Sequence, residues 1–308
     1  MSGSNDEVLD KMAPRLQRNW DERAAANFIC GGVGSGLLAA MMLFAAVGSG
    51  RRVVVALALV LMAGGLTAVW LEIGRPMRAL NVYRNAKTSW MTREAFIAGL
   101  AFLSGAVAVL FDWPGAYWLA GLFGFAFLYS QARILKANKG IPAWREESIV
   151  ALIVTTDLTE GAALLSICAF IWSDIAPFSV LVIGLITLVF LRLIAWRGFD
   201  EWPGYLPQLR RLGAPTGTLK VFDAIEMQFV WFGHVAPLVA LFLALLFGWH
   251  WLLAVAGLLA LGAGGWFKYV LVCQAAFTQG LALPKTPAHG AGPGGAGERP
   301  GWTALPGG

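Results

Sequence analysis

Residues 51–111, RRVVVALALVLMAGGLTAVWLEIGRPMRALNVYRNAKTSWMTREAFIAGLAFLSGAVAVLF, contain two long apolar runs separated by a basic segment. Each run has about 20 mostly apolar residues, which is the length an α-helix needs to cross a hydrocarbon layer about 30 Å thick. The carboxylates Glu72 and Glu94 bracket the basic segment. The stretch therefore predicts two membrane-spanning helices joined by a basic loop.

The rest of the chain repeats this pattern. It is 58% hydrophobic and only 13% charged, whereas soluble proteins carry about 25% charged residues. Because backbone groups in lipid must satisfy one another, and the runs lack the alternation of barrel strands, the spans should be helices. We predict an all-α integral membrane protein with eight transmembrane helices. The expected spans cover residues 27–48, 53–73, 92–112, 115–134, 149–171, 176–196, 223–247 and 251–276.

Positive charges gather on one side of these spans. Eighteen Lys and Arg residues lie in the N-terminal segment 1–26 or are assigned to the 2–3, 4–5 and 6–7 loops, and this count includes Arg192. The other side has only Arg51 and Arg52. Since cytoplasmic loops carry the excess of Lys and Arg, we expect both termini in the cytoplasm, N-in and C-in. No apolar segment precedes the first span, so we expect no cleaved signal peptide, and residues 277–308 form a flexible Gly/Pro-rich tail.

Metal and haem ligands are scarce. Cys30, Cys168 and Cys273 each lie in an apolar span without CxxC spacing, so we expect buried thiols rather than a disulfide, zinc or iron–sulfur site. A bis-histidine haem needs two facing imidazoles, and only His234 lies well inside a span. We therefore expect no metal and no haem in this chain.

Glu72 and Glu94 support two interpretations. Arginine and glutamate side chains at a membrane boundary can extend to the headgroups and fix a loop. Alternatively, the carboxylates form a protonatable site for a lipid-soluble redox carrier, since oxidation of a quinol releases two protons that a positioned acceptor must take.

Other acidic residues lie in spans five and seven. Asp157 and Glu160 are three residues apart and share a helix face, about 12 to 17 Å from the start of their span. At that depth they are either paired carboxylates that hold helices together or part of a proton route. Asp223 and Glu226 have the same spacing, so a transporter path through these four residues is an alternative function.

Small residues cluster in the first span, in CGGVGSGLL at residues 30–38. A nucleotide-binding loop is excluded because these glycines follow no strand. Gly32 and Gly36, together with Gly31 and Ser35, instead suit close packing of helices or close approach of a flat ring to the backbone.

Three motifs resemble the NrfD/DmsC-type membrane anchor subunits of molybdopterin oxidoreductases. The first is LEIGRPMRALNVYRNAKTSWMTREAF, which is similar to the family's Gly-x-Pro-x-Arg-Ala segment followed by Ser-(Trp/Ala)-(Leu/Met)-Ser/Thr-x-Glu. The others are ANKGIPAWREE before the fifth span and LTEGAALL inside it. The resemblance implies two four-helix bundles: an N-terminal one at 27–134 with the quinone site, a cytoplasmic loop at 135–148, and a C-terminal one at 149–276.

The resemblance also implies site residues. Gly74, Arg78 and Glu94 match positions that the family links to quinol binding, and Glu72 stands where the dimethyl sulfoxide reductase anchor has His. Glu94 and Glu72 would then transfer protons, with Arg78 stabilising negative charge. Two further residues match polar groups that contact quinone in the polysulfide reductase anchor: Asn27 and Tyr129.

The implied function is electron transfer between cytoplasmic partners and the quinone pool, either menaquinone or ubiquinone. The partners would be an iron–sulfur subunit and a molybdopterin (Mo or W) catalytic subunit that holds the substrate chemistry, together with membrane lipids and no nucleic acid. They would dock on loops 74–91, 136–148 and 197–221, with Trp90, Trp144 and Trp202 as aromatic anchors. A cytoplasmic docking face in a bacterial or archaeal inner membrane suits quinone reduction, and RLQRNWDERAAANF is similar to the phenylacetyl-CoA:acceptor oxidoreductase type.

Overall fold

The computed structural model describes residues 13–72, 89–199 and 201–280. Within these ranges, eight helices are long and apolar enough to cross a membrane, so the predicted all-α fold is confirmed and the chain is a multi-pass membrane protein. The spans are Glu22–Leu43, Arg51–Leu71, Trp90–Phe111, Pro114–Ala137, Ile149–Ile171, Phe178–Arg197, Thr216–Phe247 and His250–Gln274. The seventh begins at Thr216 rather than at the predicted residue 223, because α11 extends beyond the apolar run.

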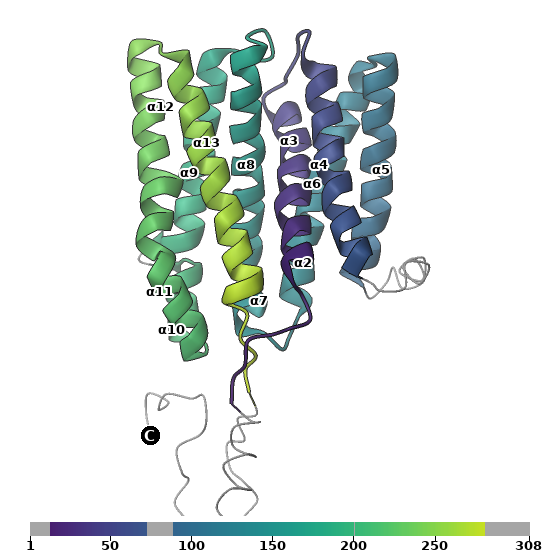
Figure 1. The fold of residues 1–308 in the computed structure, drawn as a ribbon. Coiled ribbons are helices and arrows are strands. Elements are labelled where there is room, and N and C mark those ends of the chain that lie inside the picture. Colours follow the sequence, from purple (N-terminus) through teal and green to yellow (C-terminus); the bar gives the residue numbers. More distant parts are fainter. Residues whose placement is uncertain (1–12, 73–88, 200, 281–308) are drawn as a thin grey trace, which may run out of the picture.

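The first four spans pack together as the N-terminal bundle (Figure 1). The first span is divided by a π-helical turn and lies against the second bundle. The elements of this bundle are α2 (Glu22–Ala26), η1 (Asn27–Gly31), α3 (Gly32–Leu43), α4 (Arg51–Glu72), α5 (Trp90–Phe111) and α6 (Pro114–Ala137).

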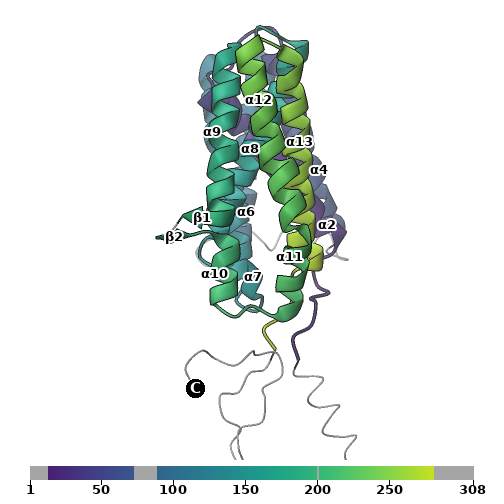
Figure 2. The same ribbon diagram turned by 90° about the vertical axis from the view of Figure 1, so that its left-hand side faces the viewer.

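The last four spans form the C-terminal bundle (Figures 1 and 2). The seventh and eighth spans of the chain, which belong to this bundle, also contain π-helical turns. The elements are α8 (Ile149–Ile171), α9 (Phe178–Arg197), α11 (Thr216–Val230), η3 (Trp231–Val235), α12 (Ala236–Phe247), α13 (His250–Tyr269) and η4 (Val270–Gln274).

Shorter elements lie at one end of the molecule, which we call the loop end (Figure 2). They are α7 (Pro142–Arg145), α10 (Tyr205–Arg211) and an antiparallel pair of two-residue strands, β1 (Gly198–Phe199) and β2 (Trp202–Pro203). Both described chain ends also lie there, since Gln17 N donates to Ala276 O at 2.9 Å. Because an even number of spans returns the chain to the side on which it started, both described ends lie on the same side of the membrane.

Trp144 was expected as an exposed anchor at the loop end, and this prediction is wrong. Its ring is 1% exposed and stacks on Trp20, with 4.7 Å between ring centroids. Its Nε1 donates to Leu271 O at 3.0 Å. The ring is buried because it packs between Trp20, which precedes α2, and η4 at the end of the eighth span. Trp202, by contrast, is 79% exposed.

Small residues bring the two bundles together where α3 crosses α8. A Cβ built on Gly36 would overlap the carbonyl of Asp157, and one on Gly161 would overlap the backbone of Gly36. A Cβ on Gly32 would overlap the side chains of Asp157 and Lys268. The prediction that Gly32 and Gly36 permit close helix packing is therefore confirmed.

Candidate functional site

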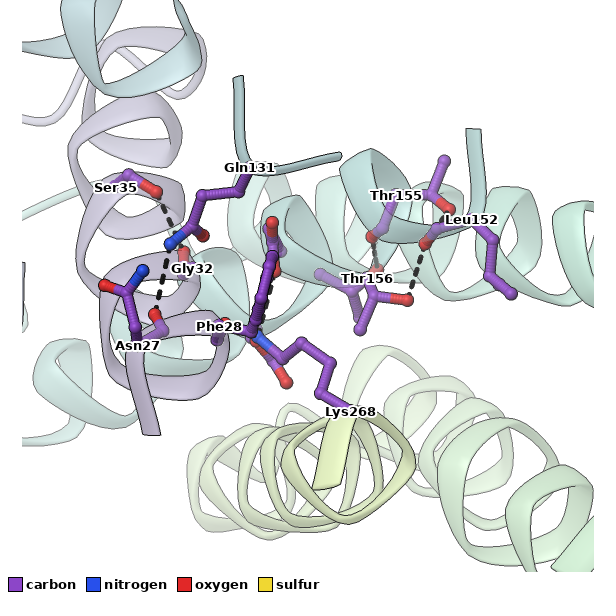
Figure 3. Close-up of polar contacts among 12 residues, drawn as sticks. Asn27, Phe28, Gly32, Ser35, Gln131, Leu152, Thr155, Thr156 and Lys268 are labelled. Atoms are coloured by element: carbon purple, nitrogen blue, oxygen red, sulfur yellow. Dashed lines mark hydrogen bonds and ion pairs between the residues drawn. The ribbon is translucent and has the colours of Figure 1, made fainter. Parts of the chain in front are cut away.

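The π-helical turn η1 is where the two bundles exchange polar contacts. The carbonyl of Asn27 accepts from Gln131 Nε2 of α6 at 3.1 Å, and the carbonyl of Phe28 accepts from Lys268 Nζ of α13 at 2.8 Å. Figure 3 shows these side chains converging on the turn. π-Helical turns are rare and recur at functional sites. Here, successive backbone acceptors face donors from both bundles.

On the side of the N-terminal bundle, Glu94, Asn27 and Gln131 form what we call the Glu94 cluster. All three side chains are buried, with Glu94 only 6% exposed. Asn27 and Gln131 are the polar neighbours of the Glu94 carboxyl. Glu94 Oε1, Asn27 Oδ1 and Gln131 Oε1 lack a hydrogen-bond partner in the described part of the chain. Buried acceptors of this kind normally have partners, so the cluster suits a molecule that brings hydroxyl donors.

Glycines shape the space beside this cluster. A Cβ on Gly31 would lie 2.7 Å from Gln131 Nε2, and a Cβ on Gly65 of α4 would lie 3.1 Å from Asn27 Oδ1. Neither position tolerates a side chain without a shift of its neighbours. The backbones of η1 and α4 therefore approach the amide groups directly.

Tyr129 lies beside Trp90, one helical turn before Glu94 on α5. The Tyr129 and Trp90 ring centroids are 5.9 Å apart, and Tyr129 Oη accepts from Arg133 Nη1 at 2.9 Å. The guanidiniums of Arg93 and Arg133 lie 4.4 and 4.5 Å from the centre of the Trp90 ring. This aromatic and cationic group lies between the Glu94 cluster and the loop end.

The remaining predicted site residues are less fully described. Glu72 is the last residue of α4 and therefore lies at the loop end, and its side chain is outside the described residues. Gly74 and Arg78 lie outside them too. The structure thus brings Glu94 and Asn27 together, and adds Gln131, which the sequence did not single out.

A second polar group, the Lys268 cluster, lies on the other side of η1. Lys268 Nζ is 2.9 Å from Asp157 Oδ1 and also forms an ion pair with Glu160. These three side chains are completely buried. Asp157 and Glu160 share one face of α8, as predicted, and they are paired carboxylates. Lys268 is not predictable as a site residue from the sequence, because a single lysine inside an apolar run carries no signal of its partner.

Arg192 was counted as a loop cation, and this assignment is wrong. It is completely buried inside α9. Its guanidinium donates to His234 Nε2 at 3.2 Å, to Ala260 O at 3.1 Å and to Gly233 O. Since His234 Nε2 is an acceptor, Nδ1 carries the proton and donates to Phe229 O at 3.0 Å. Both nitrogens of this imidazole are therefore engaged within the C-terminal bundle.

Asp223 and Glu226 lie at the loop end. Arg210 Nη2 is 2.7 Å from Asp223 Oδ1 and 2.9 Å from Glu226 Oε2, and Arg197 pairs with Glu226 at 3.0 Å. The hydrogen bond to Asp223 makes the largest contribution to raising the pKa of the Arg210 guanidinium, and Glu226 also contributes. These ion pairs join α10 and the end of α9 to α11.

No group of His, Cys, Asp and Glu suited to hold a metal ion occurs in the described residues. Cys168 is buried, whereas Cys30 and Cys273 are partly exposed, and none of them is in a disulfide there. A scan against protein-family models finds no match, and neither does a search of curated proteins. The NrfD/DmsC-type resemblance therefore stays a prediction.

Proposed function

We propose that this chain is the membrane anchor and quinone-reactive subunit of an oxidoreductase complex. It passes electrons between a cytoplasmic iron–sulfur and molybdopterin partner and the quinone pool, in the direction of quinone reduction. The observation that carries the proposal is the Glu94 cluster, a buried carboxylate beside two amides whose acceptor oxygens are unpartnered. The motif resemblance adds the class of complex.

The Glu94 cluster fits the polar end of a quinone. A quinone exchanges two electrons and two protons between its carbonyl and hydroxyl forms. Glu94 supplies a proton-holding carboxyl inside the membrane, while Asn27 and Gln131 supply amide groups that orient an oxygen-bearing ring. Because Glu94 is one turn inside α5, a headgroup there stays close to the loop end, where an electron-donating partner would dock.

The loop end provides the docking face in this proposal. Its hairpin exposes Phe199 and Trp202, and Arg211 and Lys220 are exposed nearby. Aromatic and arginine side chains are enriched in protein interfaces. The electrons would enter from an iron–sulfur cluster of the partner on this face.

The test is Glu94→Gln in the assembled complex. We expect quinone-linked turnover to fall about 10²-fold or more, since the amide cannot transfer a proton. Reduction of a water-soluble dye by the partner subunits should be unchanged, and all subunits should still co-purify. Glu147→Gln is the matched control, because the Glu147 side chain is 83% exposed and pairs with Lys136. Full quinone turnover in Glu94→Gln would refute the proposal.

An ion-coupled transporter is the alternative, and the Lys268 cluster is the observation that favours it. Buried ionisable groups at membrane depth commonly mark ion or proton paths. In that case Asp157→Asn would abolish substrate uptake by proteoliposomes that hold the purified chain alone, and Glu94→Gln would not. Purification from the native host without an iron–sulfur partner would favour this alternative.

A further inference from the structure

The end of the molecule opposite the loop end carries a polar cleft of about 490 Å³, lined by Gly48, Ser49, Arg51, Arg52 and Asp112. The cleft lies where the turn between α3 and α4 meets the turn between α5 and α6. It has no part in the proposed quinone chemistry, which lies near the loop end.

Two guanidiniums share one carboxylate in this cleft. Arg51 Nη2 is 2.7 Å from Asp112 Oδ1, and Arg52 Nη2 is 3.0 Å from Asp112 Oδ2. Tyr117 Oη also donates to Asp112 Oδ1 at 2.7 Å. Each guanidinium has five N–H donors, so the pair has more donors than one carboxylate can accept. The group keeps one net positive charge and free donors on Arg52, whose side chain is 49% exposed.

One other carboxylate lies close to the cleft. Asp174, in the turn between α8 and α9, accepts from Ser49 N at 2.8 Å and from the Ser49 hydroxyl at 3.4 Å. With Asp174 included, the region holds two arginines that share Asp112 and a second carboxylate bound at Ser49. A zwitterionic group with an anionic phosphate and a cationic amine matches this arrangement.

An apolar cavity of about 130 Å³ adjoins the cleft, and Arg51 lines both spaces. Its walls include Met41, Met42, Pro114 and Trp118. The Arg51 guanidinium lies 4.7 Å from the centre of the Tyr117 ring, at the boundary between the two spaces.

The level of this boundary matches that of lipid headgroups. Trp113 and Trp118 are both 56% exposed at this end of the bundle. Tryptophan is enriched where the hydrocarbon layer meets water. A ligand here would have its polar part in the arginine cleft and its apolar part in the cavity.

We propose that these adjoining spaces bind one phosphatidylethanolamine molecule. Its phosphate accepts from Arg51 and Arg52, which present the planar donors that suit phosphate. Its ammonium lies toward Asp174, and the first part of an acyl chain lies along Met41, Met42 and Trp118. The lipid joins the α3–α4 turn to the α5–α6 turn.

The test is native mass spectrometry of the full chain released from nanodiscs of phosphatidylethanolamine. Wild type should retain one lipid. Arg52→Gln should lower its occupancy about tenfold, since the substitution removes a charged hydrogen-bond donor to the phosphate. Asp112→Asn frees guanidinium donors and should keep or raise occupancy. Arg18→Gln, an exposed arginine before α2, is the control and should leave the lipid occupancy unchanged.

The opposite responses of Arg52→Gln and Asp112→Asn separate lipid binding from a merely structural ion pair. Equal loss of lipid in both variants would overturn the proposal, and so would a wild-type chain without retained lipid. Ala46→Phe, which fills the apolar cavity without a change of charge, should also release the lipid. Retention in this folded variant would contradict the proposed place of the acyl chain.

Discussion

The two buried clusters beside η1 differ in whether their carboxylates form an ion pair with a cation in the described residues. In the Lys268 cluster, a cation binds two carboxylates and the carbonyl of Phe28, while Asp157 Oδ2 and Glu160 Oε1 have no hydrogen-bond partner in the described part of the chain. In the Glu94 cluster, a carboxylate has two amides beside it, and three acceptor oxygens remain without partners in the described part of the chain. The first arrangement joins helices through ion pairs, whereas the second holds a carboxylate without an ion pair in the described residues, which suits a hydrogen-bonding ligand. The difference separates a structural joint from a candidate binding site.

The largest expected effect is on the Lys268 cluster. Lys268→Met leaves two carboxylates buried without their cation, and loss of one partner from a buried ion pair costs about 3–5 kcal/mol. We expect a matching loss in the free energy of unfolding, measured by denaturant titration in detergent. Lys220→Met, an exposed lysine, is the control.

Adding Asp157→Asn and Glu160→Gln to Lys268→Met removes the charges together and should recover much of this stability. If Lys268→Met is as stable as the Lys220→Met control, the Lys268 cluster does not hold the helices together, and the contrast between the two clusters fails.

The next effect concerns the packing around that joint. Gly161→Val places a side chain where the backbone of Gly36 lies, and overpacking of this kind costs typically about 1–3 kcal/mol. The melting temperature in detergent should fall. Gly262→Val is the control, since a Cβ at Gly262 meets no atom within 4 Å. Equal melting temperatures would show that the bundles are not held at this crossing.

A smaller effect is expected in the Glu94 cluster. Gln131→Leu keeps the side-chain size but removes the amide, and loss of one neutral hydrogen bond costs about 0.5–1.5 kcal/mol. The KM for quinone should rise up to about tenfold with kcat nearly unchanged. Gln208→Leu on α10 is the control. A fall in kcat alone would assign Gln131 a role in the chemical step rather than in binding.

The smallest effect is on the surface ion pair at the opposite end. Hydrogen bonds from Arg52, Tyr117 and Arg51 hold the pKa of the Asp112 carboxyl well below its usual range. A carboxyl with a lower pKa in the folded than in the unfolded state stabilises the fold at pH values above its unfolded pKa of about 4. This contribution is lost as the pH falls through the pKa of the folded state. When the pH is lowered from 5 to 3, the melting temperature of Asp112→Asn should therefore fall less than that of the wild type. If the melting temperatures of the two proteins change in parallel with pH, the ion pair of Asp112 with the arginines adds no stability.

The sequence allowed the spans and part of the site to be predicted for physical reasons. Length and hydropathy are local properties, so the eight spans follow from short windows. The shared face of Asp157 and Glu160 follows from helix geometry. Glu94 was predicted from its position beside the basic segment and from the motif resemblance, whereas Asn27 came from the resemblance alone.

Other features depend on contacts between distant spans. Lys268 pairs with residues more than 100 positions earlier in the sequence. Gln131 likewise donates to the carbonyl of Asn27, 104 positions earlier. Arg192 was misassigned because a buried arginine near a span end has the same local sequence as an interfacial one. The π-helical turn at Asn27 has no local sequence signature, since the carbonyls of Asn27 and Phe28 accept hydrogen bonds from side chains of other spans.

The pairing of the first span with the last has a consequence for biogenesis. Lys268 meets the Phe28 carbonyl across 240 positions and the Asp157 carboxylate across 111. At about 5–20 residues per second of synthesis, the ribosome takes roughly 5–20 s to add Lys268 after Asp157. During that interval the insertion machinery holds two carboxylates whose cation has not yet been made. A chain that ends before the eighth span lacks Lys268 and therefore keeps both carboxylates buried in the membrane without that cation.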